Sequence, residues 1–477
     1  MLLFCSTAIA FNSALAIELV STNSGGQQSP STNGSQLASA ISNDGNTILF
    51  RSFDTTLIPG SGLQNFYIKT LNDGRLIEII RRLDGRPLEQ GGNHFASMDE
   101  PPTRVVFSTR ESNILPNTAV RLRIYSTAIG SYVFQPIRGI ADDPEILGFT
   151  DFAANSRLDR VYMEIGMRGD LGQETSQIVE VNAAVATPAK ILTVRPDGRP
   201  SQLLGTFALP GYWPSISVSG DGRWVTWQGD QLDVDPVGFG NTIFSNEARN
   251  LFIRDTQTGV TKKVLADNGR NLYWPTFQRV ADDGSFVAFN MDGYFTPPCG
   301  DAKSDNGLGI VGFDTRTGRR ECISLNDAGE PGNGFYARLD VSGDGSRVVF
   351  SSTSTNLSSV TQNPIYFGLY VRDRRLNRTV RIDISDSGVP GNRRALLPRI
   401  SRNGRWVVFT SDSSNLIPND SNGHQYDLYR VDLYRFLPDP NVIQQRISVP
   451  IFSPVGFSIL LFGVLVIVWW KRLAVHG

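Results

Sequence analysis

The chain has 477 residues, with 45 lysines and arginines against 46 aspartates and glutamates and no basic cluster. Proteins that bind nucleic acid need such a cluster, so the composition argues against a nucleic-acid partner. Only His94 and His424 lie in the body of the chain, and two scattered histidines are too few for a zinc site or a hydrolase triad.

The first 16 residues are almost entirely apolar or small and end in Ala14-Leu15-Ala16, a small-x-small pattern. Such a segment is typical of a secretory signal peptide, here cut before Ile17. A buried first strand is the alternative, but the segment lacks the polar alternation of a strand. We therefore predict an exported protein.

A turn motif recurs along the body of the chain. Five copies end in a glycine, and an aromatic residue follows each glycine five positions later. The glycines are Gly45, Gly222, Gly284, Gly345 and Gly404. The period is about 60 residues, and the long first gap has room for two weaker copies, near Pro102 and Ser156. Such a period predicts an array of seven units, none of which can bury its apolar face alone.

Each unit is predicted to contain four short strands. The Asp-Gly or Asn-Gly pair of the motif predicts a tight hairpin turn in which both residues have positive φ. The next strand is rich in Val, Phe and Trp, as a buried strand should be. A third strand, such as 250–253, ends in a polar turn such as Asp255–Gly259, and a fourth strand follows. In a later copy Asn377 replaces the glycine, which fits a left-handed backbone there.

Repeated four-stranded units without helical periodicity predict an all-β fold, a seven-bladed β-propeller spanning residues 17–448. A β-sandwich with coincidental turns is the alternative. Either Ile17–Ser21 or Gln445–Val449 supplies the last strand of the ring, and the sequence does not decide between them. The predicted blades are residues 27–86, 87–138, 139–204, 205–266, 267–326, 327–386 and 387–448.

The units resemble the TolB-type propeller repeats of bacterial envelope proteins. The consensus of those repeats runs Ser-x-Asp-Gly-Arg-x-Val-Ala-Phe-x-Ser, then Asn-Leu-Val-Pro, then a strand that ends in Asp-x-x-Thr-Gly. Residues 39–435 carry the resemblance, clearly in units one and four to seven and weakly in units two and three. It implies the propeller fold and says little about function.

Residues 449–477 predict a sorting or transmembrane segment. The stretch from Ile451 to Trp470 has 20 uncharged residues, and Lys471 and Arg472 follow it. This is the length and the flank of a membrane-spanning helix with a cytoplasmic tail, and a core helix is the alternative. The segment also resembles the IPTL-type C-terminal sorting domain of Gram-negative bacteria, which implies a removable tag. That match begins at Val449 and rests on Pro450, Ser453 and Gly456.

Two further groups of residues are candidates for a disulfide and for a metal site. Cys299 and Cys322 both lie in unit five, and either a disulfide or two free buried thiols fits an exported protein. Asp420, Asn422 and Asp427 offer oxygen atoms ahead of a strand, an arrangement that calcium favours. A turn-shaping role for these three residues is the alternative.

Aromatic residues precede the first strand of adjacent units and are candidates for stacking on a sugar or a peptide. They are Tyr212, Trp213, Tyr273, Trp274 and Tyr336. Packing between blades is the alternative. Asp230, Asp233 and Asp235 lie together in one loop and could act as the acid and base of a propeller glycosidase, whereas a solvated loop is the simpler interpretation.

The sequence identifies no catalytic residue and, apart from the calcium candidate, no cofactor. We predict an exported, monomeric binding or scaffolding module of the cell envelope, on the periplasmic or surface side. It would be held by the C-terminal helix or released by processing, and its partner would be an envelope protein, a peptide or a glycan. One alternative is a glycan-active enzyme that uses loop carboxylates. Another is a structural part of a surface layer or a secretion apparatus.

Overall fold

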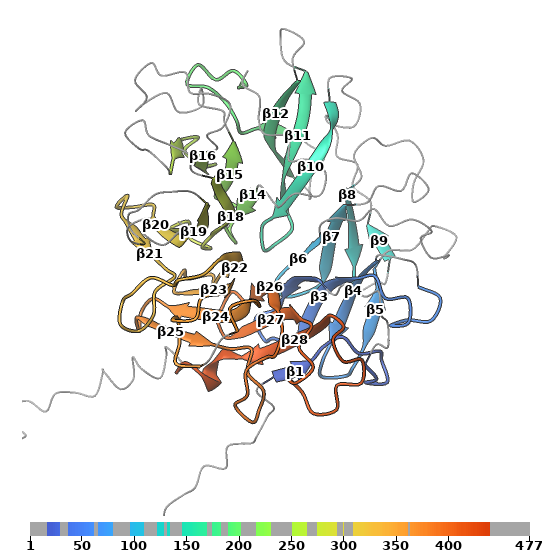
Figure 1. Ribbon diagram of the computed structural model, residues 1–477. Helices are drawn as coiled ribbons and strands as arrows, with labels where there is room; N and C mark the ends of the chain where they lie inside the picture. Colours follow the sequence, from blue (N-terminus) through green and yellow to red (C-terminus); the bar gives the residue numbers. More distant parts are fainter. Residues whose placement is uncertain are drawn as a thin grey trace, which may run out of the picture. The chain divides into compact units, whose positions relative to one another are not determined.

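The computed structural model describes residues 17–28, 37–61, 65–79, 96–108, 122–127, 131–133, 146–168, 174–182, 189–201, 216–229, 250–264, 274–292, 299, 309–360 and 363–438. The chain divides into two compact units, one that ends at Leu433 and one that begins at Tyr434. Seven antiparallel four-stranded sheets form the first unit. They stand around a common centre as the blades of a propeller, with the first strand of each blade innermost (Figure 1). The predicted seven-bladed propeller is confirmed.

Blades 1 to 6 each take their four strands from one continuous stretch of chain. Blade 1 contains β2 (Leu37–Ile41), β3 (Thr47–Ser52), β4 (Asn65–Thr70) and β5 (Leu76–Glu78), and blade 2 contains β6 (Ala96–Met98), β7 (Arg104–Ser108), β8 (Leu122–Ser126) and β9 (Ser131–Val133). Blade 3 contains β10 (Ile146–Ala154), β11 (Arg160–Arg168), β12 (Glu174–Asn182) and β13 (Lys190–Ile191), and blade 4 contains β14 (Ile216–Val218), β15 (Trp224–Gly229), β16 (Asn250–Asp255) and β17 (Thr261–Lys263). Blade 5 contains β18 (Trp274–Val280), β19 (Phe286–Asp292), β20 (Gly309–Asp314) and β21 (Arg320–Cys322), and blade 6 contains β22 (Tyr336–Val341), β23 (Arg347–Ser352), β24 (Gly368–Asp373) and β25 (Arg378–Arg381).

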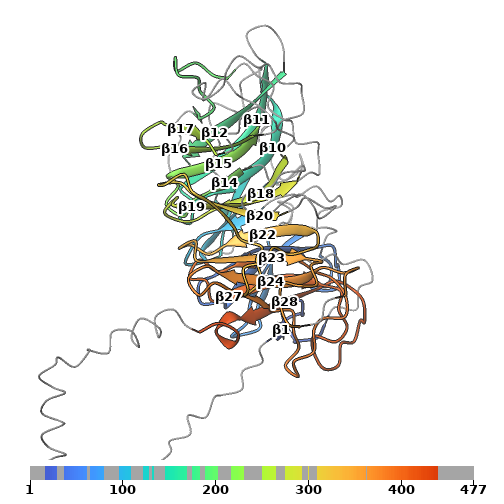
Figure 2. The ribbon, with the colours of Figure 1, turned by 60° about the vertical axis from the view of Figure 1, so that its left-hand side comes forward.

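Blade 7 joins the two ends of the propeller unit. Its first three strands are β26 (Ala395–Ile400), β27 (Trp406–Ser411) and β28 (Asp427–Asp432), and its fourth is β1 (Ile17–Leu19). The strand β1 lies antiparallel to β28, with Ile17 opposite Val431 and Leu19 opposite Tyr429 (Figures 1 and 2). Of the two alternatives for ring closure, the N-terminal strand is therefore the one that the structure has. The competing residues 445–449 lie outside the described part of the chain.

The recurrent turn joins the first and second strands of a blade. In blade 1 the Gly45 N–H donates to the carbonyl of Ser42 at 2.9 Å, and Gly45 has a φ of 72°. The expectation that both residues of the Asp-Gly pair have positive φ was wrong, because Asp44 does not. The Asp44 carboxylate instead accepts the Asn46 N–H at 2.9 Å and so fixes the turn through its side chain.

The same left-handed position is occupied in the weaker third copy by Leu158, which has a φ of 49° and is fully buried. The polar turn between the third and fourth strands behaves as predicted. Gly259 and Gly318 have positive φ there, and Asn377 takes the equivalent place with a φ of 51°. Positive φ is thus the property that these turns share, rather than glycine itself.

The aromatic residue that follows each turn lies in the second strand and stacks on an aromatic residue of the third strand in four blades. The stacked pairs, with the distance between ring centroids, are Phe50–Tyr67 (5.6 Å), Trp227–Phe252 (5.5 Å), Phe350–Tyr370 (6.0 Å) and Phe409–Tyr429 (5.8 Å). All eight side chains are buried. Each pair adds about 0.5–1.5 kcal/mol to the stability beyond the area that it buries.

The turn glycines also allow neighbouring blades to approach each other. Each turn glycine lies under the residue that is two positions after the turn of the preceding blade. A Cβ atom on Gly284 would lie 2.0 Å from the ring of Trp224, and one on Gly45 would lie 2.4 Å from the ring of Trp406. Two demands therefore meet at these positions, a left-handed backbone and close contact with an aromatic ring.

An anchor residue just after the fourth strand accepts a hydrogen bond from the backbone of the third strand in four blades. In blade 6 the Asp383 carboxylate accepts the Leu369 N–H at 2.9 Å, and in blade 7 the Ser21 hydroxyl accepts the Leu428 N–H at 3.0 Å. The corresponding pairs are Ile178 with Thr193 (3.2 Å) in blade 3 and Ile310 with Ser324 (3.1 Å) in blade 5. These anchor residues escaped the sequence analysis.

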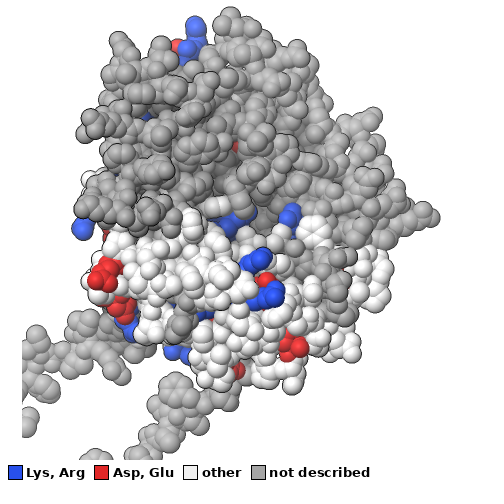
Figure 3. Space-filling view, in the orientation of Figure 1, with Lys and Arg blue, Asp and Glu red and all other residues white. Residues whose placement is uncertain are grey.

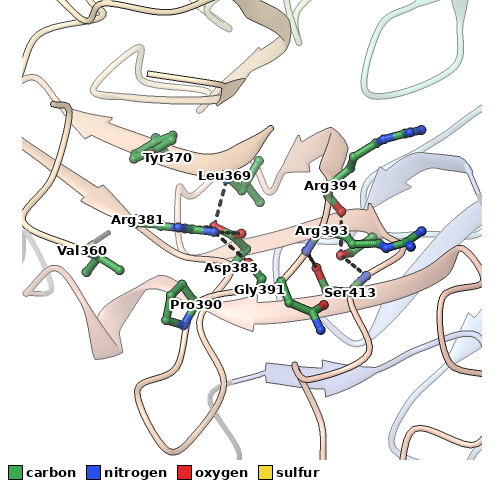
Figure 4. Close-up of polar contacts among 12 residues, drawn as sticks. Val360, Leu369, Tyr370, Arg381, Asp383, Pro390, Gly391, Arg393, Arg394 and Ser413 are labelled. Atoms are coloured by element: carbon green, nitrogen blue, oxygen red, sulfur yellow. Dashed lines mark hydrogen bonds and ion pairs between the residues drawn. The ribbon is translucent and has the colours of Figure 1, made fainter. Parts of the chain in front are cut away.

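The blade 6 anchor is part of a buried ion pair. Arg381 donates Nε and Nη2 to the two carboxylate oxygens of Asp383, each at 2.8 Å (Figure 4). The two side chains are 2% and 0% exposed, so the charges depend on each other for solvation. The Gly391 N–H donates to the Asp383 carbonyl at 2.9 Å, which ties the pair to the connection that leads to blade 7.

The described residues contain one short 3-10 helix, η3 (Leu433–Arg435), and no α-helix. No helix within this part of the chain is long and apolar enough to cross a membrane. The predicted membrane span 451–470 and the predicted signal peptide 1–16 both lie outside the described residues, so each stays a prediction.

Candidate functional site

A cavity of about 240 Å³ lies at the centre of the ring, and residues from all seven blades line it. The lining comes from the ends of the innermost strands and from the turns that follow them. Blades 1 to 4 contribute mostly small or apolar residues, whereas blades 5 to 7 contribute charged ones. The charged lining residues of blades 5 to 7 are Arg279, Asp282, Asp340, Arg399 and Arg402. We call this space the channel.

A circuit of hydrogen bonds surrounds one end of the channel, and we call it the turn ring. Each donor is a backbone N–H of one turn, and each acceptor belongs to the turn of the next blade. The links run from Asn43 to Glu100 Oε2 (2.9 Å), Glu100 to Ser156 O (2.9 Å), Ser156 to Gly220 O (3.0 Å), Gly220 to Asp282 Oδ1 (3.0 Å), Asp282 to Gly343 O (2.7 Å) and Gly343 to Arg402 O (2.7 Å). Asn403 completes the circuit by donating its N–H to Asn43 Oδ1 at 3.0 Å.

An ion pair crosses the turn ring. The Arg402 guanidinium of blade 7 reaches Asp282 of blade 5. Two glycines leave room for it, because a Cβ on Gly220 would lie 2.3 Å from Arg402 Nη1 and one on Gly343 would lie 2.4 Å from Asp282 Oδ2. Burial raises the pKa of Asp282, against the opposing effect of Arg402. Side chains therefore span this end of the channel, which we call the mouth.

Three charged side chains lie on the innermost strands of blades 5 to 7, three residues before the members of the turn ring. We call them the charge cluster: Arg279, Asp340 and Arg399. The Arg279 Nε lies 3.2 Å from Asp340 Oδ1, and Asp340 Oδ2 accepts the Ile400 N–H at 3.0 Å. Arg399 donates its Nε to the Ser39 carbonyl at 3.0 Å. Within the described residues that is the one hydrogen bond of the Arg399 side chain, so its two terminal nitrogens have no protein partner there.

The electrostatics of the cluster leave one positive charge without a counterion. Burial, which is the larger effect, and repulsion from Arg279 together lower the pKa of Arg399 to about 10, and only Asp340 acts against this. Arg399 still carries its charge at neutral pH. Glu100, at the mouth, has a pKa raised first by burial. The cluster thus carries one surplus positive charge, and the mouth, with Glu100, Asp282 and Arg402, carries one surplus negative charge.

The calcium candidates are brought together, but around an amide group. The Gln28 Nε2 donates to Asp420 Oδ1 (3.0 Å), Asn422 Oδ1 (3.0 Å) and Asp427 Oδ2 (2.8 Å). Asp427 Oδ1 accepts the Ser21 hydroxyl at 2.6 Å. Across the described residues no group of three or more His, Cys, Asp or Glu side chains could hold a metal ion. The cluster therefore joins the N-terminal segment to blade 7.

Among the aromatic candidates, Tyr336 has a described side chain, and it does not line the channel. Tyr336 packs inside blade 6, with its ring 6.0 Å from that of Phe350 and its hydroxyl 3.3 Å from the Ser354 hydroxyl. Burial raises its pKa. Trp274 begins β18 opposite Asp292. Tyr212, Trp213 and Tyr273 lie outside the described residues.

Cys299 and Cys322 are joined by a disulfide across 23 residues, so the structure takes the bonded alternative. The loop carboxylates Asp230, Asp233 and Asp235 lie outside the described residues, as do all the residues of the predicted sorting segment. On the face that Figure 3 shows, the basic and acidic side chains of the described residues are scattered and do not form a patch of one sign.

Comparison with known proteins supports the fold. No protein-family model matches the chain, and no curated protein matches its sequence. Among solved structures it is similar to the oligogalacturonate lyase of Vibrio parahaemolyticus, at 14% identity and a TM-score of 0.51, over 88% of this chain and 97% of that one. An oligogalacturonate lyase in complex with manganese gives 14% identity and a TM-score of 0.52, over 88% and 96%. The likeness is one of fold.

TolB from Acinetobacter baumannii is also similar, at 13% identity over 83% of this chain and 78% of that one. Its TM-score of 0.35 is too low to carry an argument. The repeat motifs that resemble TolB-type units nevertheless form propeller blades here, as the resemblance implies.

The sequence analysis missed both the turn ring and the charge cluster. A signal for each was present. The residue before the Asp-Gly or Asn-Gly pair is polar or glycine in every unit, as in Asn43, Gly220 and Arg402. Three residues earlier, consecutive units carry Arg279, Asp340 and Arg399, where the other units have alanine or serine.

Proposed function

We propose that this protein is an exported, non-enzymatic binding module of the bacterial cell envelope that takes its ligand in the propeller channel. The observation that carries the proposal is the cavity of about 240 Å³ with Arg399 in its wall. Among the described residues this guanidinium is partly buried, donates a single hydrogen bond and is repelled by Arg279, and such a group is suited to recognise a ligand.

The surroundings of the cavity are preorganised. Its wall consists of strands from seven sheets, and a backbone N–H links each turn of the turn ring to the next. A site that needs little ordering when its ligand arrives retains more of the interaction free energy as affinity. The rigid ring therefore favours a binding role.

The described carboxylates of the channel favour recognition over proton transfer. Asp340 is held by Arg279 and a backbone N–H, and Asp282 is held by Arg402 and the Gly220 N–H. The other two carboxylates of the lining are also held, Asp99 by Arg104 and Glu100 by the Asn43 N–H. A general acid or base must instead reach the reacting atoms of a substrate. The competing class is a glycan-active enzyme that uses Asp230, Asp233 and Asp235.

Two features support the location in the envelope. The disulfide between Cys299 and Cys322 suits an oxidising compartment outside the cytoplasm. The sequence adds the predicted signal peptide 1–16 and the predicted sorting or transmembrane segment 449–477. A monomer attached through that segment would present the propeller to envelope proteins, peptides or glycans.

The test compares three full-length proteins purified in mild detergent: the wild type, Arg399→Met and Arg319→Met. Arg319 is an exposed residue in a turn of blade 5, so its variant removes the same charge from outside the channel. Each protein is immobilised and exposed to protein, glycan and small-molecule fractions of the envelope. We expect a component that the wild type and Arg319→Met retain and Arg399→Met does not.

If all three proteins retain the same component, the binding surface lies elsewhere and the channel proposal is overturned. Turnover of a retained glycan, lost when Asp230, Asp233 and Asp235 are replaced together by asparagine, would favour the enzyme class.

A further inference from the structure

We propose that the channel binds the carboxylate of a small monoanionic ligand and that Arg399 is the residue that receives it. This inference deepens the proposed function and depends on it, because it names the chemical class of the group that enters the channel. It also makes Arg399 a specificity-determining residue rather than part of the scaffold.

The first argument is the geometry of Arg399. Its Nε is fixed on the Ser39 carbonyl at 3.0 Å, which orients the planar guanidinium. Its two terminal nitrogens have no partner among the described residues, yet the side chain lines the channel. A guanidinium presents such nitrogens in a fork that matches the two oxygens of a carboxylate. Arg279 does not compete for this role, because Asp340 already holds it at 3.2 Å.

The charges along the channel favour a ligand with a single negative charge. The charge cluster has one surplus positive charge on Arg279, Asp340 and Arg399. The mouth has one surplus negative charge, because Glu100 and Asp282 face the single cation of Arg402, while Asp99, which also lines the cavity, is paired with Arg104. A monoanion bound at Arg399 neutralises the cluster. A dianion such as phosphate would add repulsion from the mouth, so carboxylates are favoured over phosphates.

Arg399 has a pKa lowered by burial and by Arg279, which means that its charge is poorly compensated. Arginines with a structural role have their terminal nitrogens occupied within the fold, as Arg381 has by Asp383 and Arg372 has by Thr379 and Asn377. Replacing Arg399 by an uncharged side chain of similar volume should therefore not destabilise the propeller, although it should abolish binding.

The experiment titrates the full-length protein with propionate and with propionamide, its neutral analogue of the same shape, at low ionic strength in a buffer without carboxylates. Calorimetry and the thermal unfolding midpoint are both recorded. We expect propionate to bind and to raise the midpoint, and propionamide to bind at least about tenfold more weakly, because a charged hydrogen-bonded pair is lost. Inorganic phosphate should bind more weakly than propionate.

Three variants refine the test. Arg399→Met should lose propionate binding without a lower midpoint, and Arg399→Lys should bind more weakly because a point charge replaces the fork. Arg319→Met is the control and should bind as the wild type does. Glucuronate, a short peptide with a free carboxyl terminus and the same peptide as its amide then distinguish a sugar acid from a peptide end as the source.

Equal binding of propionate and propionamide, unchanged binding by Arg399→Met, or tighter binding of phosphate would each overturn the assignment. Its failure is distinguishable from failure of the proposed function. If retention of an envelope component requires Arg399 but no carboxylate binds, the binding role is supported and the carboxylate assignment is wrong. If propionate binds but no envelope component depends on Arg399, the proposed function falls.

Discussion

Blades 6 and 7 make the same backbone hydrogen bond by two different routes. In blade 6 the anchor Asp383 lies 14 residues from Leu369 on a continuous chain, whereas in blade 7 the anchor Ser21 lies 407 residues from Leu428. Blade 6 uses a buried ion pair with Arg381, and blade 7 uses a network of Ser21, Gln28 and Asp427. Blade 7, where the two ends of the propeller unit meet, thus depends on several weaker contacts, whereas the continuous blade 6 depends on one strong ion pair.

The largest effect should come from removing the N-terminal partner of blade 7. Deletion of residues 17–28 removes β1 and the fully buried Val20, and it exposes the edge of β28. We expect a loss of at least about 5 kcal/mol in the free energy of unfolding, measured by chemical denaturation. A synthetic peptide of residues 17–28 should restore part of it, because the closure is non-covalent. An unchanged denaturation midpoint would contradict the role of β1.

The next effect tests the ion pair of blade 6. Asp383→Ala leaves the Arg381 charge buried without its partner, at 2% exposure. We expect a loss of about 3–5 kcal/mol in urea denaturation. The double variant Arg381→Met with Asp383→Leu removes both charges and should recover much of it. If the single and double variants lose equally, the anchor acts through packing and not through charge.

Blade 5 adds a covalent bond to the same kind of anchor. The disulfide Cys299–Cys322 closes a loop of 23 residues beside the anchor Ser324. The double variant Cys299→Ala with Cys322→Ala should lose about 3 kcal/mol, because the unfolded chain regains the entropy of that loop. Scanning calorimetry measures the change. The wild type under reducing conditions should match the variant, and a midpoint that does not respond to either would show that the bond does not stabilise blade 5.

The smallest effect concerns the pH dependence of blade 7. Burial raises the pKa of Asp427, and hydrogen bonds from Ser21 and Gln28 oppose this only in part. The folded protein therefore holds the proton more tightly than the unfolded chain, and stability falls as pH rises from the ordinary range of an aspartate through the raised pKa. Asp427→Asn should not show this loss of stability. Chemical denaturation of both proteins between about pH 3 and 7, the range around the ordinary carboxyl pKa, measures the difference. A parallel pH profile for the two would refute the assignment.

The sequence predicted the blades because their marks are local. A left-handed turn requires a residue such as Gly45 or Asn377, and a stacked cross-strand pair requires aromatic residues such as Phe350 and Tyr370. Both therefore appear in the sequence as a repeated residue type. The turn ring leaves a weaker signal, because its donors are backbone N–H groups and only three of its seven acceptors are side chains, those of Asn43, Glu100 and Asp282. The cluster around Arg399 escaped for the opposite reason, since its residues depart from the repeat and only their shared phase joins them.

The turn ring has a further consequence. Its links all run in one sense around the channel, from Asn43 onward to Asn403 and back to Asn43, so the circle has no first member. A chain with its natural ends joined and new ends cut between two other blades would meet the same neighbours at every turn. We therefore expect a circularly permuted chain to fold into the same closed propeller.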